Sequence, residues 1–241
     1  MTRVIILFFT ISLFSKHLFS QANDSIAQIV PESYEKIIPK NALTRNGLIS
    51  FHIVSGKYYF DLPATLLNKD LLMVTRITKS PEGVANVYSG DLANEMIVHF
   101  EKGPSDKILL RRDIFEVHLG DTSSEMYRSI ARSNISSIIA TFPIKAYSHD
   151  SSRMILDLAN YIIGDNEGFG IHPYLKARLK LDNLESGNSF LTNVLVFPEN
   201  VEITTFKSYV ASTNININGK RSVISETRSF QLNTSIILLP E

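Results

Sequence analysis

Short runs in which apolar and polar residues alternate, each closed by turn-forming residues, constrain the fold of this chain more than any other feature. The first complete example has apolar residues at 49, 51 and 53 that alternate with Ser50 and His52, and Ser55-Gly56 then separates this run from residues 57–60. Alternation places every second side chain on one face of a strand, and a two-residue polar turn joins antiparallel neighbours. This segment therefore predicts a β-hairpin.

Comparable patterns recur along the rest of the chain and predict a sheet with few helices. Strands are expected at residues 71–77, 95–100, 107–112, 114–118, 137–146, 153–156, 190–197, 201–210 and 230–239. Short helices are expected at 61–67, 122–134 and 157–163, with irregular structure at 168–187 and a polar linker before 230. The sequence thus predicts a β-rich α+β fold, mainly an antiparallel twisted sheet or sandwich with a few short helices.

The N-terminus has the pattern of a secretory signal peptide. Arg3 precedes an apolar run at 4–14, Lys16 ends that run well short of the roughly 20 residues that a membrane span needs, and Ser20 and Ala22 are small. We predict cleavage after Ala22 or after Ser20, with an uncleaved anchor as the alternative. The predicted organisation is a signal peptide at 1–22, an irregular lead-in at 23–46 and one β-rich domain at 47–241, exported to the periplasm or the extracellular space.

Charge and cysteine content narrow the classes of function. The chain has 24 basic and 24 acidic residues, and removal of Arg3 and Lys16 with the leader leaves a net charge of −2. This balance offers no attraction for nucleic acid. With no cysteine, the chain has no disulfide, thiolate metal site, cysteine nucleophile or lipid-modified cysteine.

The motifs that usually carry chemistry are weak in this sequence. The six histidines include no HExxH pair, and no G-x-S-x-G is present. His99 and Glu101 are two residues apart on an expected strand, which makes them weak candidates for a shared metal, although two ligands without a third are more typical of a structural pair. Residues 165–170 lack the spacing of a calcium loop or a dinucleotide fingerprint and indicate a solvated turn. We therefore predict no catalytic or cofactor-binding residue and no cofactor for this chain alone.

Several segments resemble, in order, the N-terminal, pre-catalytic region of a family of large secreted bacterial zinc-dependent metalloproteases of the HExxH, gluzincin-like type. They are Gly-Leu-Ile-Ser-Phe-His at 47–52, Tyr-Tyr-Phe-Asp-Leu-Pro at 58–63, and the runs at 71–77, 97–103, 126–129, 193–203 and 233–240. The resemblance implies a zinc-binding catalytic domain downstream. No position of this chain matches the HExxH motif, so no zinc ligand and no general base can be transferred to it.

The resemblance implies a non-catalytic accessory domain whose partner is a catalytic metalloprotease domain or subunit, with a peptide or protein as the substrate. A second hypothesis is a stand-alone exported binding or scaffolding module without proteolytic activity. A third is a hydrolase with a site around Asp91, His99 and Glu101, which predicts activity that His99→Ala abolishes. The sequence leaves the ligand and the oligomeric state open.

Overall fold

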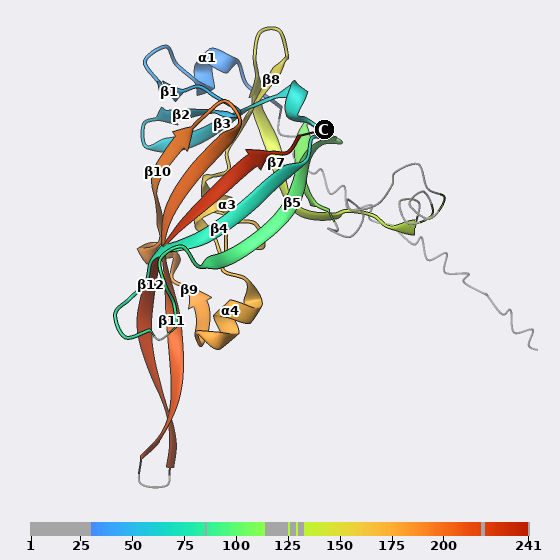
Figure 1. Cartoon of the computed structure of the whole chain (residues 1–241). Helices are drawn as coiled ribbons and strands as arrows, with labels where there is room; N and C mark the ends of the chain where they lie inside the picture. Colours follow the sequence, from blue (N-terminus) through green and yellow to red (C-terminus); the bar gives the residue numbers. More distant parts are fainter. Residues whose placement is uncertain are drawn as a thin grey trace, which may run out of the picture.

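The structure is a computed structural model that describes residues 30–84, 86–113, 125, 129, 133–217 and 220–240 (Figure 1). The predicted signal peptide, its cleavage site, the strand expected at 114–118 and most of the helix expected at 122–134 lie outside these residues.

The described residues form one antiparallel sheet of twelve strands with a few short helices, which confirms the predicted β-rich fold. Its hydrogen-bonded order is β1-β2-β3-β8-β7-β6-β5-β4-β12-β11-β10, and β9 pairs separately with β11. The strands are β1 Leu43–Arg45, β2 Ser50–Val54, β3 Lys57–Pro63, β4 Leu71–Lys79, β5 Leu92–Gly103, β6 Lys107–Arg112, β7 Ser137–Tyr147, β8 Arg153–Leu156, β9 Leu181–Leu184, β10 Phe190–Val196, β11 Asn200–Ile217 and β12 Lys220–Leu238. The predicted turn between β2 and β3 is confirmed, because Ser55 and Gly56 both have positive φ, as a tight hairpin turn requires.

Helices are short in the described part of the chain: α1 Tyr34–Ile37, α3 Ala159–Ile163, α4 Pro173–Arg178 and the 3₁₀ turns η1 Ala64–Leu66 and η3 Ser186–Asn188. None of the described helices is long and apolar enough to cross a membrane. The helix expected at 157–163 is confirmed, and the Asp157 side chain accepts a hydrogen bond from Ala159 N. The helix expected at 61–67 is wrong in extent, because residues 61–63 complete β3 and only one 3₁₀ turn follows.

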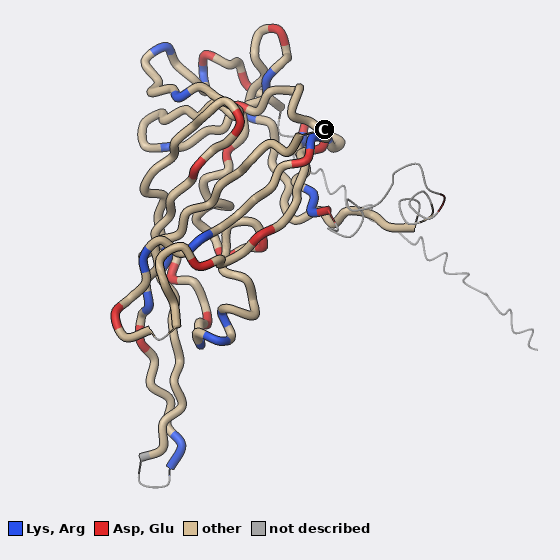
Figure 2. The backbone as a smooth tube through the Cα atoms, viewed as in Figure 1, with Lys and Arg blue, Asp and Glu red and all other residues tan. Residues whose placement is uncertain are grey.

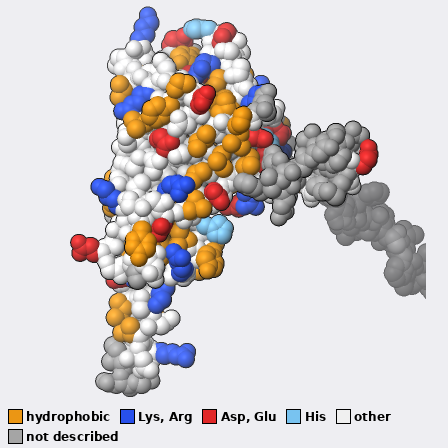
Figure 3. All heavy atoms as spheres, viewed as in Figure 1, with side chains coloured by type: hydrophobic (Ala, Val, Ile, Leu, Met, Phe, Trp, Pro, Cys, Tyr) orange, Lys and Arg blue, Asp and Glu red, His pale blue; other side chains and the backbone are white. Residues whose placement is uncertain are grey.

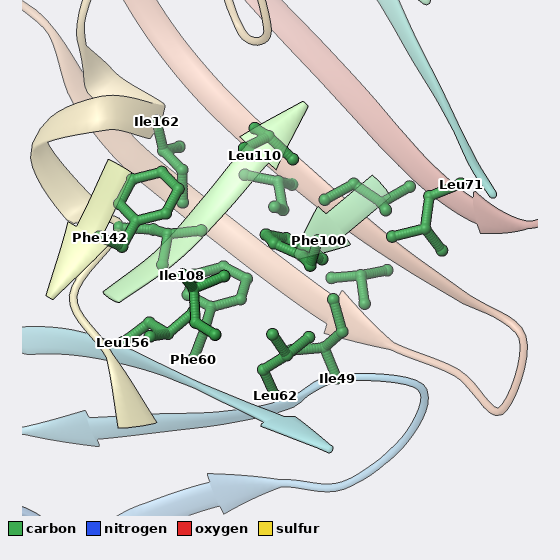
Figure 4. Packing of buried hydrophobic residues seen from close by; sticks show 14 of the residues in the cluster. Ile49, Phe60, Leu62, Leu71, Phe100, Ile108, Leu110, Phe142, Leu156 and Ile162 are labelled. Atoms are coloured by element: carbon green, nitrogen blue, oxygen red, sulfur yellow. The ribbon is translucent and has the colours of Figure 1, made fainter. Parts of the chain in front are cut away.

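The sheet bends around one main hydrophobic core, so that strands from its two ends meet. Leu48 N, beside β2, donates to Phe197 O, at the end of β10, over 2.8 Å. The same core contains Phe51 from β2, Ile203 from β11 and Ile162 from α3. Figure 4 shows Phe60, Phe100 and Ile162 converging from different elements. The bend packs strands that are remote in sequence against one another and buries their apolar side chains in one core.

The segment before residue 47, expected to be an irregular lead-in, contributes to the sheet. β1 pairs with β2 in the register Thr44↔His52, and Glu32 N donates to Lys145 O over 2.7 Å. A smaller cluster that includes Ile38 packs α1 on the rest of the domain. The sequence did not reveal this strand, because β1 is a short edge strand that is largely exposed and therefore lacks the apolar alternation of a buried strand.

The longest hairpin, β11–β12, projects beyond the body of the sheet (Figure 1). Its register runs without a break from Asn200↔Ile237 to Ile217↔Lys220. The prediction of a polar linker before residue 230 is therefore wrong, as is the prediction of irregular structure throughout 168–187, which contains α4 and β9. The sequence signal for the hairpin is the Asn218-Gly219 pair between the two strands.

Candidate functional site

The main polar cluster with metal-ligand chemistry is built by three neighbouring strands. Asp70 precedes β4, His99 lies within β5, and Asp113 follows β6. One ligand atom from each residue lies within 4.8 Å of the ligand atoms of the other two. Val98 and Phe100 belong to the hydrophobic core, so His99 between them points to the opposite face of the sheet.

Hydrogen bonds fix the imidazole in this cluster. His99 Nδ1 is 2.6 Å from Asp113 Oδ2, and the two side chains are only 17% and 10% exposed. Ser136 Oγ donates to Asp113 Oδ1 over 2.5 Å. The hydrogen bond to Asp113 raises the pKa of His99 above its ordinary value against the effect of burial, and the charges of Asp113, Asp70 and Glu101 act in the same direction. This group can hold a proton or a metal ion.

The predicted pair His99 and Glu101 does not form the shared site. Both side chains lie on one face of β5, but Glu101 Oε2 accepts a hydrogen bond from Arg111 Nε at 2.5 Å. Arg111 Nη1 also donates to Ser136 O over 2.7 Å, which ties this ion pair to the cluster. The residues that approach His99 are Asp70 and Asp113, which sequence reasoning missed because both lie outside β5.

The structure also does not assemble the hydrolase arrangement of Asp91, His99 and Glu101. Asp91 precedes β5, and the seven residues between Asp91 and His99 run along the strand, which places these two residues roughly 25 Å apart. The Asp91 carboxylate instead accepts a hydrogen bond from Tyr88 N over 2.8 Å.

A second polar region surrounds the loop at 164–170, which was expected to be a solvated turn. Asn166 Oδ1 accepts hydrogen bonds from Gly168 N at 3.0 Å and Phe169 N at 2.9 Å, so the loop is tightly folded. A Cβ on Gly170 would lie 2.4 Å from Asn166 O, and this close approach requires glycine. Phe169 is buried in the main core, which anchors the loop.

Lys207 of β11 lies beneath this loop and is fully buried. Its Nζ donates to Gly164 O over 2.6 Å and to Phe169 O over 2.8 Å. Burial lowers the pKa of Lys207 to about 7, although the nearby Asp165 carboxylate acts in the opposite direction. The lysine therefore connects the loop to the sheet through two hydrogen bonds to backbone carbonyl groups.

The loop forms one wall of a cavity of about 420 Å³, and the other walls come from β5, the end of β6 and the start of α4. Arg112 pairs with Glu167 at 2.5 Å, and Lys176 pairs with Asp165. Two ion pairs therefore form part of the cavity lining, which also includes Glu95.

A third polar network lies between β1, β2 and β3, inside the segments that carry the sequence resemblance. Thr44 Oγ1 is 2.8 Å from His52 Nδ1, and His52 Nε2 is 3.3 Å from Asp61 Oδ2. Asp61 Oδ1 also pairs with Arg153 Nε of β8 at 2.9 Å. This network joins four strands, and because His52 and Asp61 are buried, it has the character of a structural polar network.

Two protein-family models match this chain, each over a different segment. Residues 90–241 match the model described as Domain of unknown function (DUF5117), and residues 31–80 match Domain of unknown function (DUF5118). The chain belongs to the DUF5117 family. No curated protein and no solved structure matches it.

The two family segments form one sheet. The DUF5118 segment ends within the connection between β4 and β5, yet these two strands pair in the register Leu71↔Val98. Phe51 and Leu71 from the first segment lie in the same core as Phe100 and Ile203 from the DUF5117 segment. Asp70 and His99, from different segments, also meet in the metal-type cluster. The two segments are therefore one structural unit in this chain.

Proposed function

We propose that this chain is a non-catalytic accessory domain of an exported zinc-dependent metalloprotease and that the projecting β11–β12 hairpin docks on the catalytic domain. The observation that carries the proposal is the distal part of this hairpin, residues 212–225, called the arm below. Apart from a hydrogen bond from Ser212 N to Lys180 O at the base of the arm, its two strands pair only with each other in the described chain. The identity of the partner, the catalytic domain of a zinc-dependent metalloprotease, is inferred from the sequence resemblance.

The arm has little to stabilise it within the described chain. A two-stranded hairpin is only marginally stable in water unless it packs against another element. Val223 is 63% exposed and Ile224 is 51% exposed. Hydrophobic side chains are visible on the surface of the arm in Figure 3. A partner that covers the arm would bury these side chains and would stabilise the hairpin.

The register shows which face of the arm is more apolar. Thr213 is opposite Ile224, and Ile215 is opposite Ser222, so these four side chains share one face. The other face carries Ser212 opposite Ser225 and Asn214 opposite Val223. We assign the face with Ile215 and Ile224 to the catalytic domain, because it presents two large aliphatic side chains close together.

Charge supports contact with an acidic rim on that domain. Lys220 and Arg221 lie beside the free end of the arm, where Figure 2 shows basic positions without acidic ones, whereas charges of both signs are interspersed over the body. In this proposal the leader is removed on export, and the mature chain begins at Asn23 or Gln21.

The test measures binding between purified residues 23–241 and the HExxH catalytic domain encoded in the same protein or in a neighbouring reading frame. Burial of one isoleucine contributes roughly 1.5–3 kcal/mol, so Ile224→Asp should weaken the complex about 10- to 100-fold or more. The matched control is Ser225→Asp, which adds the same charge to the opposite face and should bind as the wild type does. Equal binding of both variants would exclude the assigned face.

A peptidase assay separates this proposal from its alternatives. The purified chain should not cleave protein substrates. Chelator-sensitive cleavage that His99→Ala abolishes would overturn the accessory function in favour of a hydrolase. No complex with the catalytic domain, measured with a correctly folded chain, would favour a stand-alone binding module.

A further inference from the structure

We propose that Asp70, His99 and Asp113 bind a divalent first-row transition metal ion such as Zn²⁺ and so form a metal site outside any HExxH motif. The three residues supply two carboxylates and one imidazole, with ligand atoms within 4.8 Å of one another. Each side chain is partly buried, so the group is neither a fully solvated acidic patch nor sealed from an entering ion.

The fold places the ligands together through strand register. Leu71 is opposite Val98, so the preceding residue Asp70 is level with His99 on the neighbouring strand. On the other side of β5, Asp113 N donates to Ile97 O over 2.9 Å, which holds Asp113 diagonally next to His99. β5 thus carries His99, and the adjoining ends of β4 and β6 place Asp70 and Asp113 beside it, so strand pairing positions all three ligands.

Surrounding hydrogen bonds orient the ligands before any ion enters. Ser136 Oγ donates to Asp113 Oδ1, which leaves Oδ2 directed at His99. Leu239 N donates to Asp70 O over 3.0 Å and ties the backbone of that ligand to the end of β12. Such outer contacts fix ligand orientation in known metal sites and affect metal affinity.

The ligand set is suited to Zn²⁺ or Mn²⁺. In a tetrahedral zinc site with bonds of about 2.0–2.1 Å, ligand atoms lie about 3.3 Å apart. The separations here are at most 4.8 Å, and the hydrogen-bonded distance of 2.6 Å between His99 Nδ1 and Asp113 Oδ2 would widen as the metal replaces the proton between them. An imidazole with two carboxylates suits a borderline cation, whereas Ca²⁺ takes six to eight oxygen ligands. Three protein ligands also leave a coordination position for water or for a group from a partner.

Electrostatics favour a cation at this position. Asp70 and Asp113 both face His99, and Glu101 adds negative charge that Arg111 partly neutralises. The same carboxylates that stabilise the protonated imidazole also stabilise a metal ion in its place. Metal binding must displace the proton from His99, so affinity should rise with pH until the imidazole is neutral.

The competing explanation is a protonated His99 that pairs with Asp113 and binds no metal. The two explanations differ in the role of Asp70. The metal site requires its carboxylate as a ligand, whereas the His99–Asp113 pair does not require it. The metal site also does not depend on docking of the arm, which belongs to a different part of the sheet.

The experiment measures Zn²⁺ bound per mature chain by equilibrium dialysis and calorimetry, with Mn²⁺ and Ca²⁺ in parallel. We expect one equivalent of Zn²⁺, more than about 100-fold weaker binding in His99→Ala and Asp70→Asn, and weak binding of Ca²⁺. His149→Ala, at an exposed histidine remote from the cluster, is the control and should bind as the wild type does. Ser136→Ala should weaken binding about tenfold by releasing Asp113.

Thermal unfolding without metal identifies variants that fail to fold. If His99→Ala does not fold, Ser136→Ala still tests the proposal. Zinc should raise the unfolding temperature of the wild type and not that of Asp70→Asn. No zinc binding by the folded wild type, or unchanged binding by folded Asp70→Asn, would overturn the site and leave the protonated pair.

Discussion

Replacement of Lys207 by methionine should remove a pH dependence of stability that burial of this lysine creates. Lys207 is fully buried, and its pKa is lowered from 10.5 to about 7. That difference corresponds to about 5 kcal/mol of unfavourable free energy for the charged form in the folded protein. Methionine has a similar length without charge, so the variant lacks this contribution at every pH.

The direction of the effect follows from proton binding. Between pH 7 and 10.5 the unfolded chain holds a proton on Lys207 that the folded chain does not. Stability should therefore increase as pH rises through this window, with a limiting slope of about 1.4 kcal/mol per pH unit. Below pH 7 Lys207 is protonated in both the folded and the unfolded chain, so the full free-energy cost of burying its charge remains. Between pH 7 and 9.5 the expected gain is about 3 kcal/mol.

Urea unfolding of the wild type and Lys207→Met at half-unit steps from pH 6 to 9.5 measures this gain. The upper limit avoids Tyr161 and Tyr209, whose pKa values burial raises and which would lower stability once the unfolded tyrosines ionise. Loss of the hydrogen bonds to Gly164 O and Phe169 O shifts the variant by a constant amount, so only the difference in slope is diagnostic. The exposed control Lys57→Met should keep the wild-type slope. Equal slopes for the wild type and Lys207→Met would refute the reasoning.

Two further predictions concern the sheet. Residues 90–241 alone should not fold, as shown by circular dichroism and proteolysis, because the missing segment supplies eight buried side chains to the main core at roughly 1.5–3 kcal/mol each, more than a typical domain stability. Addition of residues 31–80 should restore protection, and a stable isolated fragment would contradict a shared core. Asp61→Ala should lower the free energy of unfolding by about 3 kcal/mol, because it leaves Arg153 and buried His52 without their carboxylate. The exposed pair His149–Glu35 provides the control: Glu35→Ala should leave the free energy of unfolding close to that of the wild type in the same urea titration, and a loss equal to that of Asp61→Ala would contradict the role of burial.

Local patterns predicted the strands well where alternation was strong and turns were short. The strands expected at 107–112 and 153–156 have these same limits in the structure, and Ser55-Gly56 closes the β2–β3 hairpin as predicted. The largest error has a physical cause. Residues 211–229 are mostly polar or charged, and their few apolar residues, such as Ile215 and Ile224, are too sparse to mark a buried strand face, so backbone pairing with a neighbouring strand determines their structure.

The candidate sites depended even more on tertiary structure. His99 was identified from its sequence, but the proximity of Glu101 in the chain suggested a pairing that Arg111 prevents. Asp70 and Asp113 are 29 and 14 positions from His99, and only the pairing of β4 and β6 with β5 brings them close. The sequence did not indicate that Lys207 is buried, because its burial depends on the loop at 164–170, which covers it only in the folded structure.

The sequence by itself determined the periodicity of the strands, the turns between several of them and the absence of thiol chemistry, because these depend on residue type and on neighbours a few positions away. Tertiary structure alone decided that both family segments share one core, that Asp70, His99 and Asp113 converge, and that the arm extends beyond the sheet. These features arise from pairings between distant strands, and many distant pairings are compatible with the same local alternation.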